Sequence, residues 1–240
     1  MKRRIVTYEI SAPEIRREHL LAMLSDLHCG PWEDLLQPLR DAEGILVAGD
    51  LVDRHSGAFE PAVDFLRTIC RDKPVWFAPG NHEMKHPERK KVIRLIRKTG
   101  VHWLYNSLEY YEEFTIGGLV RESRKQVRTE VLDRMERESG YRLLLCHHPE
   151  VYRDRVAGRA IHLTLSGHAH GGQVRIFGQG LYAPGQGLFP KLTHGVYDDG
   201  RLIVSSGLTN GARVPRFNDP CEMVLLHLKP GEERKVITIE

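Results

Sequence analysis

Five short, mostly apolar stretches of this chain each lead directly into side chains that bind metal ions well. The stretches are residues 20–24, 44–47, 75–78, 142–146 and 161–165. Runs of this length are typical of buried strands and too short for helices. Amphipathic stretches lie between them, and this alternation predicts an α/β sandwich. Ligands bind in loops beyond the carboxyl ends of such strands, so we expect the polar groups on one rim.

The spacing of apolar residues, together with the glycine and proline residues that end helices and strands, predicts further elements along the chain. The expected strands are Ile5–Ile10, Leu20–Leu24, Gly44–Val47, Val75–Ala78, Phe114–Gly117, Arg142–Cys146, Ile161–Leu165, Gln173–Ile176, Leu202–Ser205 and Met223–His227. The expected helices are Glu33–Ala42, Glu60–Arg71, Pro87–Lys98 and Arg128–Ser139. The first helix contains Pro38, which should kink or end it, because proline lacks the N–H of the helical hydrogen bond.

Length and composition indicate one globular domain over residues 1–240. The apolar content of 41% is ordinary, and a net charge of +3 is too small to predict a nucleic-acid partner. The four cysteines have no paired spacing, so we expect reduced thiols in a cytosolic protein. No stretch reaches the roughly 20 apolar residues of a membrane span. The sequence therefore predicts a soluble, cytoplasmic chain and leaves peripheral membrane association open.

The polar groups after the apolar stretches form an ordered set: Asp26-x-His28, Gly49-Asp50-x-x-Asp53, Gly80-Asn81-His82-Glu83, His147-His148 and Gly167-His168-x-His170. Carboxylate, imidazole and amide oxygen are the ligands of hard and borderline divalent ions. Two such ions about 3.5–4 Å apart need a bridging carboxylate. Asp50 suits that place, because Gly49 lets the backbone approach closely. A single Asp-x-His pair is more often an exposed pair with no role in metal binding, and His147 alone is more often a packed histidine. The whole ordered set, in contrast, favours a metal site.

The set resembles the full signature of the calcineurin-like metallophosphoesterases, from residue 26 to residue 170. The resemblance implies a four-layer αββα sandwich with the active site at the carboxyl ends of the strands. One divalent ion would be held by Asp26, His28 and His170, and a second by Asn81, His147 and His168, with Asp50 bridging both. Manganese, iron or zinc would fit this set, and manganese is favoured for activity. A hydroxide shared by the metals would attack phosphorus in line.

The same resemblance suggests roles for three neighbouring residues. His82 would steady the transition state or protonate the leaving oxygen, for which a pKa near neutrality is suitable; the alternative is a supporting role beside the ligands. Asp53 would orient a ligand histidine. His148 is left out of the ligand set, because neighbours on a strand point to opposite sides.

Downstream segments are similar to a bacterial branch of this superfamily. They are Leu163–Val174, Lys191–Tyr197, Ser205-Ser206-Gly207, Pro215-Arg216-Phe217 and Pro220-Cys221-Glu222. Members of that branch resemble phosphodiesterases or pyrophosphatases, some acting on lipid-linked substrates such as UDP-diacylglucosamine. The branch usually has an N-terminal membrane anchor or export signal, which we do not expect here. The resemblance implies a small-molecule phosphodiester or pyrophosphate substrate, lipid-linked ones included.

Other patterns keep an alternative open. Gly49–Arg54 with Gly80–Glu83 resembles the Ser/Thr protein phosphatase branch, in which an arginine grips phosphate. Arg54, Arg213 and Arg216 are accordingly candidates for substrate binding, and solvated surface arginines are the other interpretation. The chain is thus expected to be a metal-dependent phosphoesterase, with phosphomonoesterase or protein phosphatase as the alternative. A non-catalytic scaffold is disfavoured, because every ligand position is filled.

Overall fold

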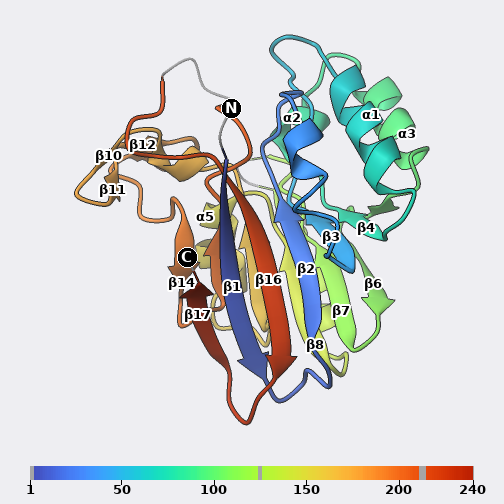
Figure 1. Ribbon diagram of the computed structural model, residues 1–240, viewed down its shortest axis with the longest axis vertical. Helices are drawn as coiled ribbons and strands as arrows, with labels where there is room; N and C mark the ends of the chain where they lie inside the picture. Colours follow the sequence, from blue (N-terminus) through green and yellow to red (C-terminus); the bar gives the residue numbers. More distant parts are fainter. Residues whose placement is uncertain (1–2, 124–125, 211–214, 240) are drawn as a thin grey trace.

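Two β-sheets packed face to face, with helices on both outer faces, form the body of the molecule (Figure 1). A computed structural model describes residues 3–123, 126–210 and 215–239. The mixed α/β arrangement confirms the expected αββα sandwich.

The first sheet is mixed and has the strand order β17-β1-β16-β2-β3-β4-β5. Strands β2 to β5 are parallel to one another, whereas β16 is antiparallel to β2 and parallel to β1. The strands, in the same order, span Lys235–Ile239, Arg4–Ala12, Glu222–Pro230, His19–Leu24, Gly44–Val47, Val75–Phe77 and His102–Trp103.

The second sheet has the order β14-β15-β9-β8-β7-β6 and is parallel from β15 to β7. Its strands span Gly195–Tyr197, Leu202–Val204, Leu163–Ser166, Tyr141–Leu145, Phe114–Gly118 and Ser107–Tyr111. Two small hairpins project from the segment after β9. They are β10 (Arg175–Ile176) with β11 (Gln179–Gly180), and β12 (Tyr182–Ala183) with β13 (Gly187–Leu188).

Short helices make the outer layers and several of the turns. α1 and α3 lie together over the first sheet (Figure 1). α4 packs on the second sheet. The α-helices are α1 (Glu60–Ile69), α2 (Asn81–Met84), α3 (Arg89–Arg97), α4 (Glu130–Met135) and α5 (Pro149–Val151). The 3₁₀ turns are η1 (Glu33–Leu35) and η3 (His170–Gly172), and η2 (Tyr152–Val156) is a π-helical turn.

Three apolar cores separate the four layers. On β3, Ile45 and Val47 contribute to the core beneath α1 and α3, while Leu46 between them contributes to the core shared by the two sheets. On β8, Leu143 and Leu145 face that shared core and Leu144 faces the core with α4. Neighbouring strand residues point to opposite faces, so a strand buried on both sides needs a continuous apolar run.

Three expectations about elements need correction. Residues 33–42 form only the short turn η1 followed by further turns, because Pro38 cannot supply a helical N–H. The helix expected over Arg128–Ser139 is shorter and spans Glu130–Met135. The strand expected from Gln173 begins at Arg175, because Gln173 closes the η3 turn with a φ of 62°.

Among the described residues, no helix is both long enough and apolar enough to cross a membrane.

Candidate metal centre

The candidate ligands all follow strand ends or begin the helix after one. Asp26 and His28 come after β2 and Asp50 after β3, whereas α2 after β4 starts with Asn81. In the second sheet, His147 follows β8, and His168 and His170 follow β9. Parallel strands end at the same edge of a sheet, so the loops of the two facing sheets meet along one rim.

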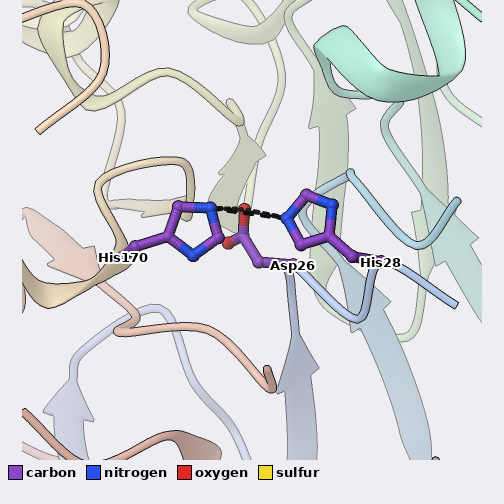
Figure 2. Close-up of side chains that lie close together, drawn as sticks. All are labelled: Asp26, His28 and His170. Atoms are coloured by element: carbon purple, nitrogen blue, oxygen red, sulfur yellow. Dashed lines mark hydrogen bonds and ion pairs between the residues drawn. The ribbon is translucent and has the colours of Figure 1, made fainter. Parts of the chain in front are cut away.

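One group of ligands consists of Asp26, His28 and His170, whose ligand atoms all lie within 4.8 Å of one another. Figure 2 shows an imidazole ring on either side of the Asp26 carboxylate. His28 Nε2 lies 3.7 Å and His170 Nε2 3.6 Å from the same oxygen, Oδ1. The two Nε2 atoms are 3.4 Å apart. Two imidazole nitrogens and a carboxylate oxygen converging in this way are a suitable ligand set for a divalent ion.

A second group consists of Asp50, His147 and His168, all buried. His147 Nδ1 lies 2.6 Å from the carbonyl oxygen of Ala48, and only a protonated nitrogen can make that hydrogen bond. His147 Nε2 is 2.9 Å from Asp50 Oδ2. Fixing Nδ1 as the donor leaves Nε2 of the neutral ring free to bind a metal.

Asp50 connects the two groups. With His28 and His82 it forms a third group whose ligand atoms lie within 4.8 Å of one another. Asp50 therefore stands within reach of ligands from both of the other groups, as a bridging carboxylate must.

Several buried polar atoms at this rim have no hydrogen-bond partner among the described residues. They include Asn81 Oδ1 and His28 Nδ1. An unpaired polar atom in a buried position is costly, and most find a partner. Asn81 Oδ1 is an atom that a metal ion would bind, and it lies at the rim with the two groups of carboxylate and imidazole ligands, so the residues present fit two divalent cations.

The electrostatics of the rim favour ionised carboxylates. Burial opposes the charge of Asp26 and Asp50, but the surrounding imidazoles outweigh it and lower the pKa of both carboxyl groups. Burial also opposes the charge of His147, yet the carboxylates of Asp50 and Asp26 raise its pKa to about 10. Without metal, the His147 ring is therefore protonated at the nitrogen that would bind a metal ion. Metal binding must displace that proton.

The backbone at the rim is unusually strained. Asp26, His28, Asp50, His168 and His170 all have positive φ angles, between 46° and 68°. Residues other than glycine rarely adopt this left-handed conformation, which is typical of functional sites. The strain turns these side chains inward from tight loops.

Glu83 supports the Asp50 loop, a role that the sequence did not reveal. Its buried carboxylate accepts hydrogen bonds from the backbone N–H groups of four residues, Asp50, Leu51, Val52 and Gly80, at 2.8–3.1 Å. Its neighbour His82 donates its own backbone N–H to Asp50 Oδ1 at 2.7 Å. The position of Glu83 directly after His82 was the only signal in the sequence for this role.

His82 lies beside Asp50 and close to the start of the following loop. Its Nδ1 accepts the backbone N–H of Arg54 at 3.2 Å, and Asp53 Oδ1 is 3.4 Å from the same nitrogen. Burial lowers the pKa of His82 to about 4, against the opposing effect of Asp50. The ring is therefore neutral at neutral pH, with its proton on Nε2. Asp53, expected beside a ligand histidine, lies beside His82 instead.

Arg216 lies against His170 in a buried network. Its Nη2 is 3.3 Å from His170 Nδ1 and donates to the carbonyl oxygens of Ser206 and Thr209 at 2.6 and 2.8 Å. Asp219 pairs with Arg216 and with Arg175, and its side chain is fully buried. These contacts favour a role for Arg216 in positioning His170, while its contact with substrate stays a prediction. Arg213 lies outside the described residues.

A pocket of about 220 Å³ opens beside the second ligand group and is lined by Asn81 and His168. Arg54 also lines it, and its contact with substrate stays a prediction. His148 forms part of its wall, with its ring centroid 4.4 Å from that of His168. His148 thus adjoins the site without belonging to a ligand group. The four cysteines are free thiols, and burial raises the pKa of Cys146 to about 12, so it stays protonated.

Comparison with known proteins agrees with this geometry. The sequence pattern of the family described as calcineurin-like phosphoesterase matches residues 19–172. An uncharacterized metallophosphoesterase of Campylobacter jejuni is 28% identical over 94% of this chain and 63% of its own length. One from Helicobacter pylori is 23% identical over 92% of this chain and 62% of its own. One from Aquifex aeolicus is 26% identical over 94% of this chain and 92% of its own.

The fold and the ligand groups are those of a metallophosphoesterase domain. The chain belongs to the calcineurin-like phosphoesterase family, whose pattern covers every candidate ligand. It spans less than two thirds of the length of the first two relatives.

Proposed function

We propose that this chain is a binuclear-metal-dependent phosphodiesterase or pyrophosphatase, formed by residues 1–240 as a single domain. The observation that carries the proposal is the position of Asp50, which stands within reach of ligands from two neighbouring groups. Asp26, His28 and His170 would hold one ion, and Asn81, His147 and His168 the other.

Bound divalent ions would lower the pKa of water to give a nucleophile and neutralise charge on the phosphoryl oxygens. The chain's own residues would orient the substrate around them. The Nε2 proton of His82 is available to donate a hydrogen bond to a phosphoryl or leaving oxygen. Arg54, which lines the adjoining pocket, would contact a phosphate of the substrate through its guanidinium.

The surroundings of the metals support a preference for a diester over a monoester. The pocket beside Asn81 and His168 offers room for the second substituent of a diester or anhydride. A phosphomonoesterase needs no such space, and this difference favours the diester class.

The proposal is tested by removing metal from the protein, adding manganese, zinc or iron back, and measuring two substrates. We expect metal-restored hydrolysis of bis-p-nitrophenyl phosphate to exceed that of p-nitrophenyl phosphate, with manganese the most active. Preference for the monoester would instead support a phosphatase.

The role of Asp50 is tested in the same assay. Asp50→Ala should abolish turnover and reduce the bound metal, because it removes the shared carboxylate. The matched control is Asp64→Ala, since Asp64 is an exposed carboxylate on α1. Full activity with normal metal content in Asp50→Ala would refute the assignment.

A further inference from the structure

The pocket beside the second ligand group collects cationic side chains from three separate loops. Arg54 follows the Asp50 loop, and Lys85 directly follows α2, four residues after Asn81. Arg121 comes from the loop after β7 and is held by an ion pair with Glu150, three residues after His147. Arg54 and Lys85 thus belong to segments that carry a candidate ligand. Arg121 is ion-paired to such a segment through Glu150.

The charges in this pocket are not balanced. Arg121 is paired with Glu150, and Glu122 interacts with Arg128 at 3.4 Å and with the hydroxyl of Tyr105 at 2.8 Å. Across the described residues, neither Arg54 nor Lys85 has a carboxylate within ion-pair distance; the Arg54 side chain donates a hydrogen bond to His55 Nε2, at 3.3 Å. Two uncompensated cations remain, matching the charge of one phosphate group.

The size of the pocket limits what these cations can hold. At about 220 Å³ it is smaller than the roughly 300–1,000 Å³ of pockets that enclose a drug-sized ligand. A phosphate group fits, whereas a nucleoside or an acyl chain would have to extend into solvent. Size and charge together favour a small anion next to the metal-bound phosphate.

We propose that Lys85 and Arg54, beside the ion-paired Arg121, form a subsite for a second phosphate, so that the enzyme recognises phosphoanhydrides in preference to diesters with a single phosphorus. This inference rests on the proposed function and narrows its substrate class to pyrophosphate-linked compounds. Lys85 is the residue most specific to it, because its exposed side chain forms no hydrogen bond or ion pair with the described residues, while its backbone N–H caps α2.

The test measures binding, so that it does not depend on turnover. Calorimetry with the manganese-loaded protein compares AMP with the non-hydrolysable anhydride α,β-methylene-ADP. We expect the anhydride analogue to bind about tenfold more tightly than AMP. Lys85→Ala should reduce that ratio about fivefold, as for a partly exposed ion pair, and Lys85→Glu should abolish it. The ratio should also fall as salt is raised.

The matched control is Lys90→Ala, because Lys90 is an exposed cation on α3 that lines a different surface groove. It should leave the ratio unchanged. Equal affinity for the two nucleotides in the unmodified protein would overturn the inference. An unchanged ratio in both Lys85 variants would also overturn it, since the second phosphate would then be held by the metals alone. Failure of the proposed function has a different signature, the absence of metal-dependent hydrolysis.

Discussion

His82 shows how a single residue at this rim is set up for one task. The backbone N–H of Arg54 holds its Nδ1 as an acceptor, and burial keeps the ring neutral with a pKa of about 4. A neutral imidazole whose Nε2 bears the proton donates a hydrogen bond without carrying a charge at neutral pH. It is less suited to giving the proton away completely, so a role in steadying the transition state is favoured over general acid catalysis.

Replacing His82 tests this role. His82→Ala should slow hydrolysis by roughly 10²–10⁴ while leaving the metal content unchanged, because its ring is not needed to hold either ion. Metal analysis and kcat on bis-p-nitrophenyl phosphate measure both effects. His82→Gln, which keeps a donor group, should recover part of the rate. Loss of metal in His82→Ala would instead make His82 a ligand or a structural support.

At the residue scale, the sequence predicted the metal-binding positions more completely than their supports. The seven candidate ligands could be named because aspartate, asparagine and histidine after a strand carry a chemical signature. Glu83 and Asp219 carry no such signature. Their roles depend on backbone N–H groups and arginines that come close only after folding, such as Arg175 and Arg216.

Among the elements, the short helix α2 has the most influence on the site. Asn81 and His82 are its first residues, and Glu83 ties it to the loop after β3 through the four backbone hydrogen bonds. A helix of one turn has little stability of its own, because nucleation is costly. Its geometry is therefore imposed by the buried carboxylate of Glu83.

Removal of that carboxylate should loosen both segments together. Each unsatisfied buried N–H costs about 1–3 kcal/mol, so Glu83→Ala should lower the free energy of unfolding by about 3 kcal/mol or more. Glu83→Gln keeps one acceptor oxygen and should cost less. Urea denaturation measures the loss, and metal analysis should show weaker binding in parallel. Unchanged stability in Glu83→Ala would mean that the loop is held by other contacts.

Element boundaries were predictable where packing and local signals agreed. Gly44–Val47 was predicted as observed, because a strand buried on both faces is a continuous apolar run. The helix predicted from Glu60 ends at Ile69, within two residues of the expected end. The edge strand β17 was not predicted, because its alternating, mostly exposed residues do not stand out from a loop.

At the scale of the whole molecule, the site joins the two sheets. Asp26, His28 and Asp50 extend from the first sheet, and His147, His168 and His170 extend from the second. The group of Asp26, His28 and His170 and the group of Asp50, His147 and His168 each contain members from both sheets. A bound ion would therefore cross-link the sandwich at its rim, adding to the apolar core that joins the sheets below.

Metal should accordingly raise thermal stability. At a concentration about 100-fold above Kd, a ligand that binds only the folded state contributes about 2.7 kcal/mol. For a chain of this size, that corresponds to a rise in Tm of about 5–10 °C. Scanning calorimetry of the metal-free protein with and without manganese measures it. Asp50→Ala should show a much smaller rise, and an equal Tm with and without metal in the unmodified protein would contradict the cross-link.

The class of fold was predictable from the alternation of apolar runs and amphipathic stretches, but the arrangement of strands was not. The parallel pairing of β1 with β16 joins residues more than 200 positions apart. Nothing in the local pattern of Ile5–Ile10 distinguishes that partner from any other apolar strand. The strand that pairs with β1 is determined by tertiary packing and not by the local sequence.

The left-handed backbone of the candidate ligands has a consequence for protein engineering. Five of them adopt a conformation that costs a non-glycine residue about 1–3 kcal/mol. Glycine at such a position would relieve the strain and destroy the ligand. A library of variants selected only for heat resistance would therefore tend to lose the candidate metal ligands, and any attempt to stabilise this protein has to select for metal binding in the same round.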